Sequence, residues 1–151
     1  MIVRNCCVGL LLGFATLFSV PNLVYAGLVL ITPEEAELPP PRGAVATDRR
    51  GITRGPKVEL VPSADPLHSP MHFQVKFETY GGSRIDPDSV KVIYLRNPNV
   101  DLTPRLKSYV QPTGIDMTDV QLPPGEHMMR VDIKDSDGRA GSTSFVLKVI
   151  P

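Results

Sequence analysis

The sequence predicts an all-β fold, in which residues 57–151 form a single antiparallel β-sandwich of about seven strands. Short runs of alternating apolar and polar residues recur from Lys57 onward, with turn residues between them. The last two runs are joined by an Asp-Ser-Asp-Gly sequence, which is typical of a β-hairpin loop. Proline is too frequent in this region for a long helix, and no stretch keeps a helical period.

The C-terminal hairpin is the clearest of the predicted elements. From His127 to Ile133, His and apolar residues alternate with residues that are mostly polar. Phe145, Leu147 and Val149 alternate in the same way in the second strand. Gly138 supplies the positive φ that the loop between the two strands needs. This pattern predicts two paired strands, each with one buried face.

The other strands are predicted from shorter signals. Residues 58–61 form a first strand, and residues 71–78 form a second in which Phe73, Val75 and Phe77 share a buried face. Residues 89–95 are apolar on both faces, which suits a strand covered on both sides. Residues 106–110 and 115–122 are weaker strand candidates on either side of a Pro-Thr-Gly turn.

The first 26 residues read as a signal peptide. Arg4 provides a short positive region, Val8–Val20 is an apolar run, and Val24-Tyr25-Ala26 offers a small-x-Ala cleavage pattern. Cleavage after Ala26 predicts a periplasmic or secreted protein. The alternative is an inner-membrane anchor over residues 5–31, because the stretch between Arg4 and Glu34 carries no charge and is long enough for a bilayer core of roughly 30 Å.

Residues 27–56 are predicted to form a flexible tail rich in Pro and Arg. Within the tail, Thr32 and Glu35 match a capping box with Pro33 at the first helical position, which predicts a short helix at residues 33–38. The tail would serve either as a spacer between the domain and a membrane or partner, or as a docking segment that orders on a partner. Arg49-Arg50 is expected to be an accessible protease site.

Charge and cysteine content exclude several classes of protein. Removal of residues 1–26 takes away one basic residue, which leaves 15 basic and 16 acidic residues, and this balance argues against an electrostatic nucleic-acid binder. Both cysteines, Cys6 and Cys7, lie in the predicted signal peptide. The mature chain would therefore have neither a disulfide framework nor a cysteine nucleophile.

The segment Leu122-Pro123-Pro124-Gly125-Glu126-His127, followed by a strand, an Asp-Ser-Asp-Gly turn and a last strand with Phe, resembles bacterial immunoglobulin-like (Ig-like) domains. The resemblance implies a single Ig-like antiparallel β-sandwich. It also implies that His127 occupies the aromatic corner position, whose polar edge ties back to nearby backbone. Such sandwiches carry many unrelated functions.

A weaker resemblance is to periplasmic copper-resistance carrier proteins, which share the Pro124-Gly125 turn and the Ser136-Asp137-Gly138 loop. Arg139 stands where that family has a metal-binding His, and a guanidinium stays protonated at neutral pH. The resemblance implies periplasmic metal handling, but the copper ligands are not matched.

Metal sites are considered at two sets of residues. A soft Cu(I) site would draw on Met71, His72 and Met128, with Met117 and Met129 as further thioethers. The alternative is that the methionines fill core gaps and the histidines lie on the surface.

Weak calcium binding would use Asp135 and Asp137 with Asp132. EF-hand spacing requires an acidic residue near position 143, which is Thr143. A hairpin turn with local side-chain hydrogen bonds is the simpler interpretation. No cofactor is expected.

Catalytic motifs are absent from the sequence. It contains no nucleophile elbow, no glycine-rich phosphate loop before a helix and no His-Glu-x-x-His motif. We therefore expect an exported, non-enzymatic interaction or structural module of the periplasm or cell envelope, whose partner is another envelope protein. The alternative is a periplasmic metal-handling protein, either a Met/His copper carrier or a weak calcium binder.

Overall fold

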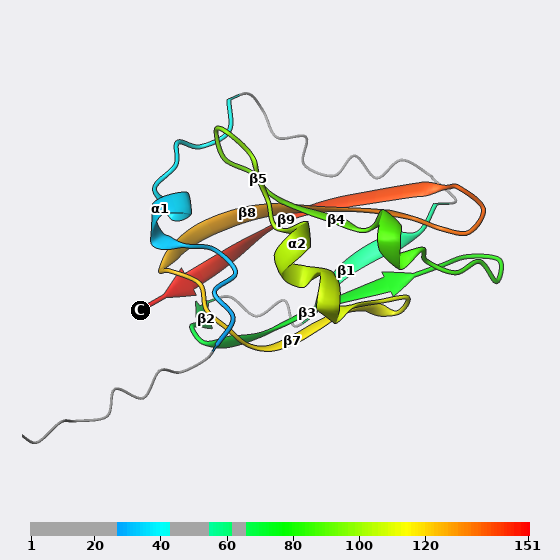
Figure 1. Ribbon diagram of the computed structural model, residues 1–151, viewed down its shortest axis with the longest axis horizontal. Coiled ribbons are helices and arrows are strands. Elements are labelled where there is room, and N and C mark those ends of the chain that lie inside the picture. Colours follow the sequence, from blue (N-terminus) through cyan, green and yellow to red (C-terminus); the bar gives the residue numbers. More distant parts are fainter. Residues whose placement is uncertain (1–26, 43–54, 62–65) are drawn as a thin grey trace, which may run out of the picture.

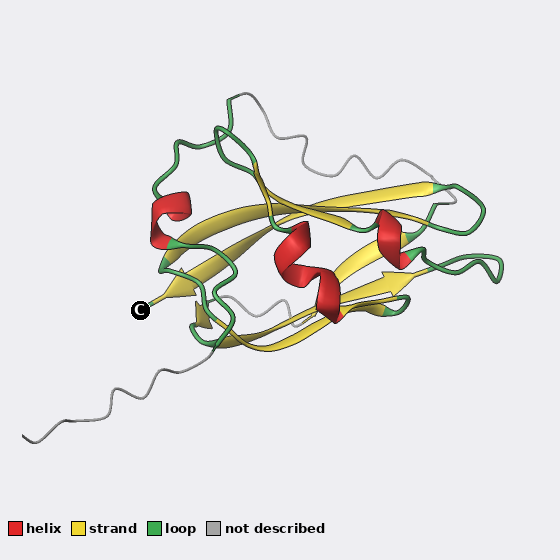
Figure 2. Ribbon diagram, in the orientation of Figure 1, coloured by secondary structure: helices red, strands yellow, loops and turns green. Residues whose placement is uncertain are grey.

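The computed structural model describes residues 27–42, 55–61 and 66–151, and it confirms the all-β prediction. Strands dominate the described chain and form two sheets (Figures 1 and 2). The four-stranded sheet has the order β1 (Lys57–Val61), β3 (Met71–Glu78), β7 (Gly114–Val120), β6 (Val110–Gln111). The five-stranded sheet has the order β2 (Leu67–His68), β9 (Ala140–Ile150), β8 (Gly125–Lys134), β4 (Lys91–Tyr94), β5 (Val100–Asp101).

Neighbouring strands are antiparallel, except that β2 runs parallel to the end of β9. The long β8–β9 hairpin pairs continuously from Gly125↔Val149 to Lys134↔Ala140, as the alternation predicts. The inner faces of the two sheets make one core. The predicted buried residues of β3 (Phe73, Val75, Phe77) and of β8 (His127, Met129, Val131, Ile133) all lie in it.

Two of the predicted strands differ from the structure. Residues 106–110 are not a strand, because α2 (Thr103–Leu106) and the 3₁₀ helix η2 (Lys107–Tyr109) occupy this segment and only Val110 begins a strand. Leu102 and Leu106, four residues apart, are both fully buried, which is helical spacing. Residues 89–95 shorten to β4 after the 3₁₀ helix η1 (Pro87–Ser89), and Ile93 on the outer face is only half-buried.

The N-terminal part of the predicted tail is packed into the domain, so the prediction of a detached flexible tail is wrong for residues 27–42. We call this segment the N-terminal strap. Leu30 and Ile31 are fully buried in the core, and Val29 forms a parallel bridge with Gln121 at the end of β7. Leu30 N–H donates to the Gln121 carbonyl (3.1 Å), and Gln121 N–H donates to the Leu28 carbonyl (2.9 Å).

The short helix predicted in the strap is present as α1 (Pro33–Ala36). The Thr32 hydroxyl accepts from Glu35 N–H (3.3 Å), and the Glu35 carboxylate accepts from Thr32 N–H (3.0 Å), which completes the predicted capping box. Arg105 at α2 forms a two-pronged ion pair with Glu35 (2.6 and 2.7 Å) and also donates to the Leu30 carbonyl (2.7 Å). We call the Arg105–Glu35 pair the latch, since it ties α1 to α2.

The predicted signal peptide, including Cys6 and Cys7, and the tail residues 43–54 with Arg49-Arg50 lie outside the described residues. Among the residues that the structure does describe, no helix is both long and apolar enough to cross a bilayer.

Candidate functional site

The structure separates the residues considered for a copper site. Met71 and His72 point to opposite faces of β3, so Met71 is buried while His72 is exposed and lies 2.7 Å from the Asp116 carboxylate. Met117 and Met129 are buried in the core. Met128 is half-buried on β8, on the outer face of the other sheet. A shared Met/His site does not form from these side chains.

The aspartates considered for calcium binding are already engaged within the protein. Asp132 bonds to Arg130 (3.1 Å) and to the Ser142 hydroxyl, and Asp137 pairs with Arg139 (2.6 Å). The Asp135 carboxylate is 1% exposed and points into its own loop. Within the described ranges no three His, Cys, Asp or Glu side chains are placed to hold a metal ion. The turn interpretation of the hairpin loop is therefore the one that the geometry favours.

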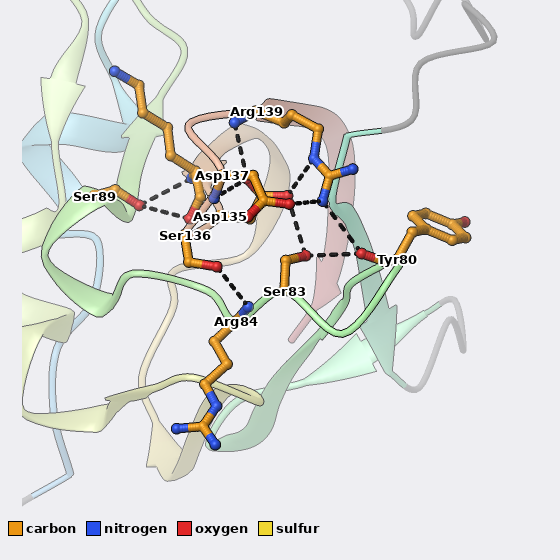
Figure 3. A network of polar contacts seen from close by, with 9 residues as sticks. Tyr80, Ser83, Arg84, Ser89, Asp135, Ser136, Asp137 and Arg139 are labelled. Atoms are coloured by element: carbon orange, nitrogen blue, oxygen red, sulfur yellow. Dashed lines mark hydrogen bonds and ion pairs between the residues drawn. The ribbon is translucent and has the colours of Figure 1, made fainter.

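A network of polar contacts joins two loops at one end of the sandwich (Figure 3). One loop connects β3 to η1, and the other is the turn of the β8–β9 hairpin. We call residues 79–84 and 135–139 together the loop end. The two loops lie far apart in the sequence, and Figure 1 shows them side by side at the end opposite the C-terminus.

Asp135 is the centre of this cluster. Its Oδ1 accepts from the backbone N–H groups of Asp137 (3.1 Å) and Arg139 (2.8 Å), which holds the turn. Its Oδ2 accepts from Arg139 Nε (2.8 Å) and from the Ser83 hydroxyl (3.3 Å) of the other loop. One buried carboxylate thus fixes both loops, because each of its oxygens accepts two hydrogen bonds.

Further hydrogen bonds connect the two loops. Ser136 N–H donates to the Arg84 carbonyl (2.7 Å), and Arg84 N–H donates to the Ser136 hydroxyl (3.2 Å). Arg139 Nη2 donates to the Tyr80 carbonyl (3.3 Å), and the Ser83 hydroxyl shares its single proton between this carbonyl (2.9 Å) and Asp135 Oδ2. The backbone of the loop end is therefore held by hydrogen bonds rather than by apolar packing.

The electrostatics of the cluster follow from this geometry. Burial alone would raise the pKa of Asp135, but hydrogen bonds from the backbone and guanidinium of Arg139, the charge of that guanidinium and the Ser83 hydroxyl bring the pKa below its usual value. Asp135 is therefore a carboxylate at neutral pH, as its four hydrogen-bond donors require.

Two large side chains project from this rigid base. Tyr80 is 49% exposed, and the Arg84 side chain, which is also exposed, extends away from the network (Figure 3). Gly81 and Gly82 follow Tyr80 with φ of 70° and 79°, a conformation that favours glycine and turns the chain sharply. The sequence analysis ended the predicted strand at residue 78 and missed both projecting side chains. The available signal was an aromatic residue beside two glycines in a loop.

Comparisons with protein families, with characterised proteins and with solved structures found no match to this chain. The functional interpretation therefore rests on the fold and on the loop end.

Proposed function

We propose that this chain is an exported, non-enzymatic Ig-like module of the cell envelope, which binds another protein through its loop end. A tyrosine and an arginine presented on a rigid base are the single observation that carries this proposal. Tyr and Arg are enriched among the residues that contribute most to protein–protein binding, and a rigid base lowers the entropy lost on binding.

The strand order supports the Ig-like part of the proposal. An Ig-type sandwich places strands A, B, E and D in one sheet, and strands G, F and C in the other. Taken in chain order, β1, β3, β7 and β6 occupy the first set of positions, and β9, β8 and β4 occupy the second. In variable-type Ig domains the loops between the second and third long strands and between the last two strands form a binding surface. The loop end comes from these two connections.

The corner at His127 gives independent support. Its Nε2 donates to the Pro123 carbonyl four residues earlier (2.7 Å), which is the tie expected of an aromatic corner at the start of this strand. Nδ1 must then accept from the Tyr94 hydroxyl (3.1 Å), and that hydroxyl accepts from Arg96 Nε (2.7 Å). Tyr94 is fully buried on β4, the strand where antibody domains carry a core tryptophan.

The chemistry of the loop end indicates the kind of surface that it would bind. Tyr80 offers an apolar ring with a hydroxyl at its edge, and Arg84 offers a guanidinium that pairs with carboxylates or carbonyls. Arg139 is already held by Asp135 and Asp137, so Arg84 is the cation free to act within the described loop end. The Tyr80 ring and the Arg84 side chain point in different directions (Figure 3), so the expected partner surface has an apolar pocket and, at a distance from it, a carboxylate.

Site-specific photocrosslinking in living cells tests this proposal, because it captures whatever protein lies against the chosen residue. A photoreactive phenylalanine replaces Tyr80 in one chain and Thr118, exposed on the outer face of β7, in a control chain. We expect one discrete crosslinked protein from position 80 and none from position 118.

Charge reversal provides the matched control. In the chain with the crosslinker at position 80, R84E should abolish the adduct, whereas K76E on the outer face of β3 makes the same charge change and should leave it. Equal adducts from positions 80 and 118, or no adduct from position 80, would contradict binding through the loop end.

A further inference from the structure

The N-terminal strap leaves no spacer between residue 26 and the folded domain. The Leu28 carbonyl already accepts from Gln121 N–H, and Leu30 and Ile31 are fully buried. Gly27 itself packs so closely that an added Cβ would lie 2.7 Å from the Asp119 carbonyl oxygen. Whatever is attached at residue 26 is therefore attached directly to the end of the sandwich.

That end of the sandwich carries an uncharged groove of about 400 Å³. Its rim is formed by Val29, which is 43% exposed, and by exposed Pro33 and Pro70, with half-buried Pro123 beside them. Its floor is formed by Ile31 and Leu122, both buried. Of the described residues that line the groove, none is charged.

The sequence attached there is also uncharged. No acidic or basic residue occurs from Asn5 to Ala26, and these residues are enough for a helix of about 30 Å, the thickness of a bilayer core.

We propose that residues 5–26 remain attached as a membrane anchor and that the groove end of the sandwich rests on the lipid surface. The partner is the bilayer itself: Val29 and the three prolines face the boundary between headgroups and acyl chains. The proposal takes the uncleaved alternative raised by the sequence, but ends the anchor at residue 26 and not at residue 31, because Leu30 and Ile31 are buried in the domain. It does not depend on the loop end, although the two fit together, since the loop end lies at the opposite end of the long axis (Figure 1). The domain would then contact the membrane through its groove end, and the loop end would point away from the membrane.

Tryptophan fluorescence tests the orientation directly, because the chain contains no Trp and any introduced Trp is the only reporter. Full-length chains carrying V29W or Y80W are placed in phosphatidylcholine–phosphatidylglycerol vesicles whose acyl chains are brominated near the headgroup. We expect the V29W chain to lose most of its emission to bromine quenching and the Y80W chain to lose little. A P33W chain should behave like the V29W chain, which guards against a local effect of one substitution.

Three results would overturn the proposal. The first is equal quenching in the V29W and Y80W chains. The second is a blue-shifted V29W emission that brominated lipid does not quench, which would show that a second copy or another protein covers the groove. The third is an envelope form of the protein whose mass corresponds to a chain that begins at Gly27, because no anchor would then hold the groove at the bilayer. None of these results depends on the photocrosslinking at position 80, so the two proposals can fail separately.

Discussion

Asp135 and His127 are the two polar residues that lie buried in the described part of the chain, and each has its polar atoms matched to specific partners. Asp135 joins two loops by accepting four hydrogen bonds. His127 joins the start of β8 to the strand β4 through Tyr94. In both cases a buried polar group specifies one geometry, because moving any partner would leave it without a hydrogen bond.

We expect D135A to lower the melting temperature by several degrees and to loosen the loop end. The substitution removes the acceptor for two backbone N–H groups and leaves the Arg139 guanidinium without its buried partner. The matched control is D137A, two residues away, whose exposed carboxylate makes one ion pair with Arg139. Thermal unfolding followed by circular dichroism measures both. Equal effects from the two substitutions would show that Asp135 does not organise the loops.

The stability of the protein should depend on the protonation of His127. Burial lowers the pKa of this imidazole, the hydrogen bond to the Pro123 carbonyl opposes the shift, and the positive charge of Arg96 adds to it. The folded protein therefore binds this proton less readily than the unfolded chain, whose histidine has a pKa of about 6.5. The free energy of unfolding should be highest above that value and fall as the pH drops toward the lower pKa of the folded state.

Urea unfolding at several values between about pH 7 and about pH 5 tests this dependence, since carboxylates contribute little in that range. H127Q is the control: it cannot take up a proton, so its stability should be lower overall but nearly constant over the same interval. A wild-type protein whose stability does not change across this interval would contradict the expected shift.

The N-terminal strap is an element that the sequence reasoning assigned to a tail, and its contacts make it part of the core. We expect L30A to lower the free energy of unfolding by about 3 kcal/mol, since truncation of a fully buried leucine leaves a cavity. V29A, at the exposed neighbouring position, should cost less than about 1 kcal/mol. Chemical denaturation of both variants measures the difference. Similar small costs for both would mean that the strap is only loosely attached.

The latch between α1 and α2 should show measurable coupling. In a double-mutant cycle with E35A and R105A we expect a coupling energy of about 1–2 kcal/mol, because the pair is two-pronged and mostly shielded from solvent. R105K should recover only part of it, since an ammonium cannot form the planar double contact. A coupling energy near zero would identify the pair as an ordinary surface contact.

The coupling should also depend on pH. The Arg105 hydrogen bond lowers the pKa of Glu35 below its usual value of about 4.5, and burial opposes this only in part. The latch therefore makes its full contribution to the free energy of unfolding above the usual pKa of Glu35. This contribution is lost as the pH falls through the lower pKa of Glu35 in the folded state. The cycle repeated at about pH 3 should give a smaller coupling energy than at about pH 7.

The elements that could be predicted from the sequence are those in which one physical signal dominates. Strand β3 and the β8–β9 hairpin show a two-residue period because one face of each strand is buried. The capping box of α1 is a local motif and needed no tertiary information. By contrast, α2 is one turn long and packs through Leu106, so its helical period was too short to outweigh the strand-like residues that follow.

The strap and the loop end were missed for a different reason, because both depend on contacts between distant parts of the chain. Leu30 and Ile31 are continuous in sequence with an apolar leader and precede a run of prolines, so their composition indicated a leader and tail. The Leu30 backbone is held by hydrogen bonds with Gln121 and Arg105, which lie 91 and 75 residues away in the sequence. In the same way the Asp-Ser-Asp-Gly turn indicated its own hairpin, but its partner Ser83 could not be read from it.

The folded domain therefore includes residues that precede residue 57, where the strand pattern predicts that it begins. A chain of residues 27–151 should fold, whereas a chain of residues 57–151 should not form a stable domain. Without the strap, the core surface that covers Leu30 and Ile31 is open to water, and the loss of two buried aliphatic side chains, at roughly 2–5 kcal/mol each, approaches the total stability of a typical small domain.

Addition of the missing segment in trans distinguishes loss of packing from loss of chain connectivity. A synthetic peptide of residues 27–42 should restore dispersed amide signals in the NMR spectrum of the 57–151 chain. The same peptide with Leu30 and Ile31 changed to aspartate should not, because carboxylates cannot enter the apolar core without a large desolvation cost. A 57–151 chain that folds equally well without the peptide would show that the strap is an accessory to the sandwich. The contacts of Leu30, Ile31 and Glu35 instead make residues 27–42 a structural part of the domain.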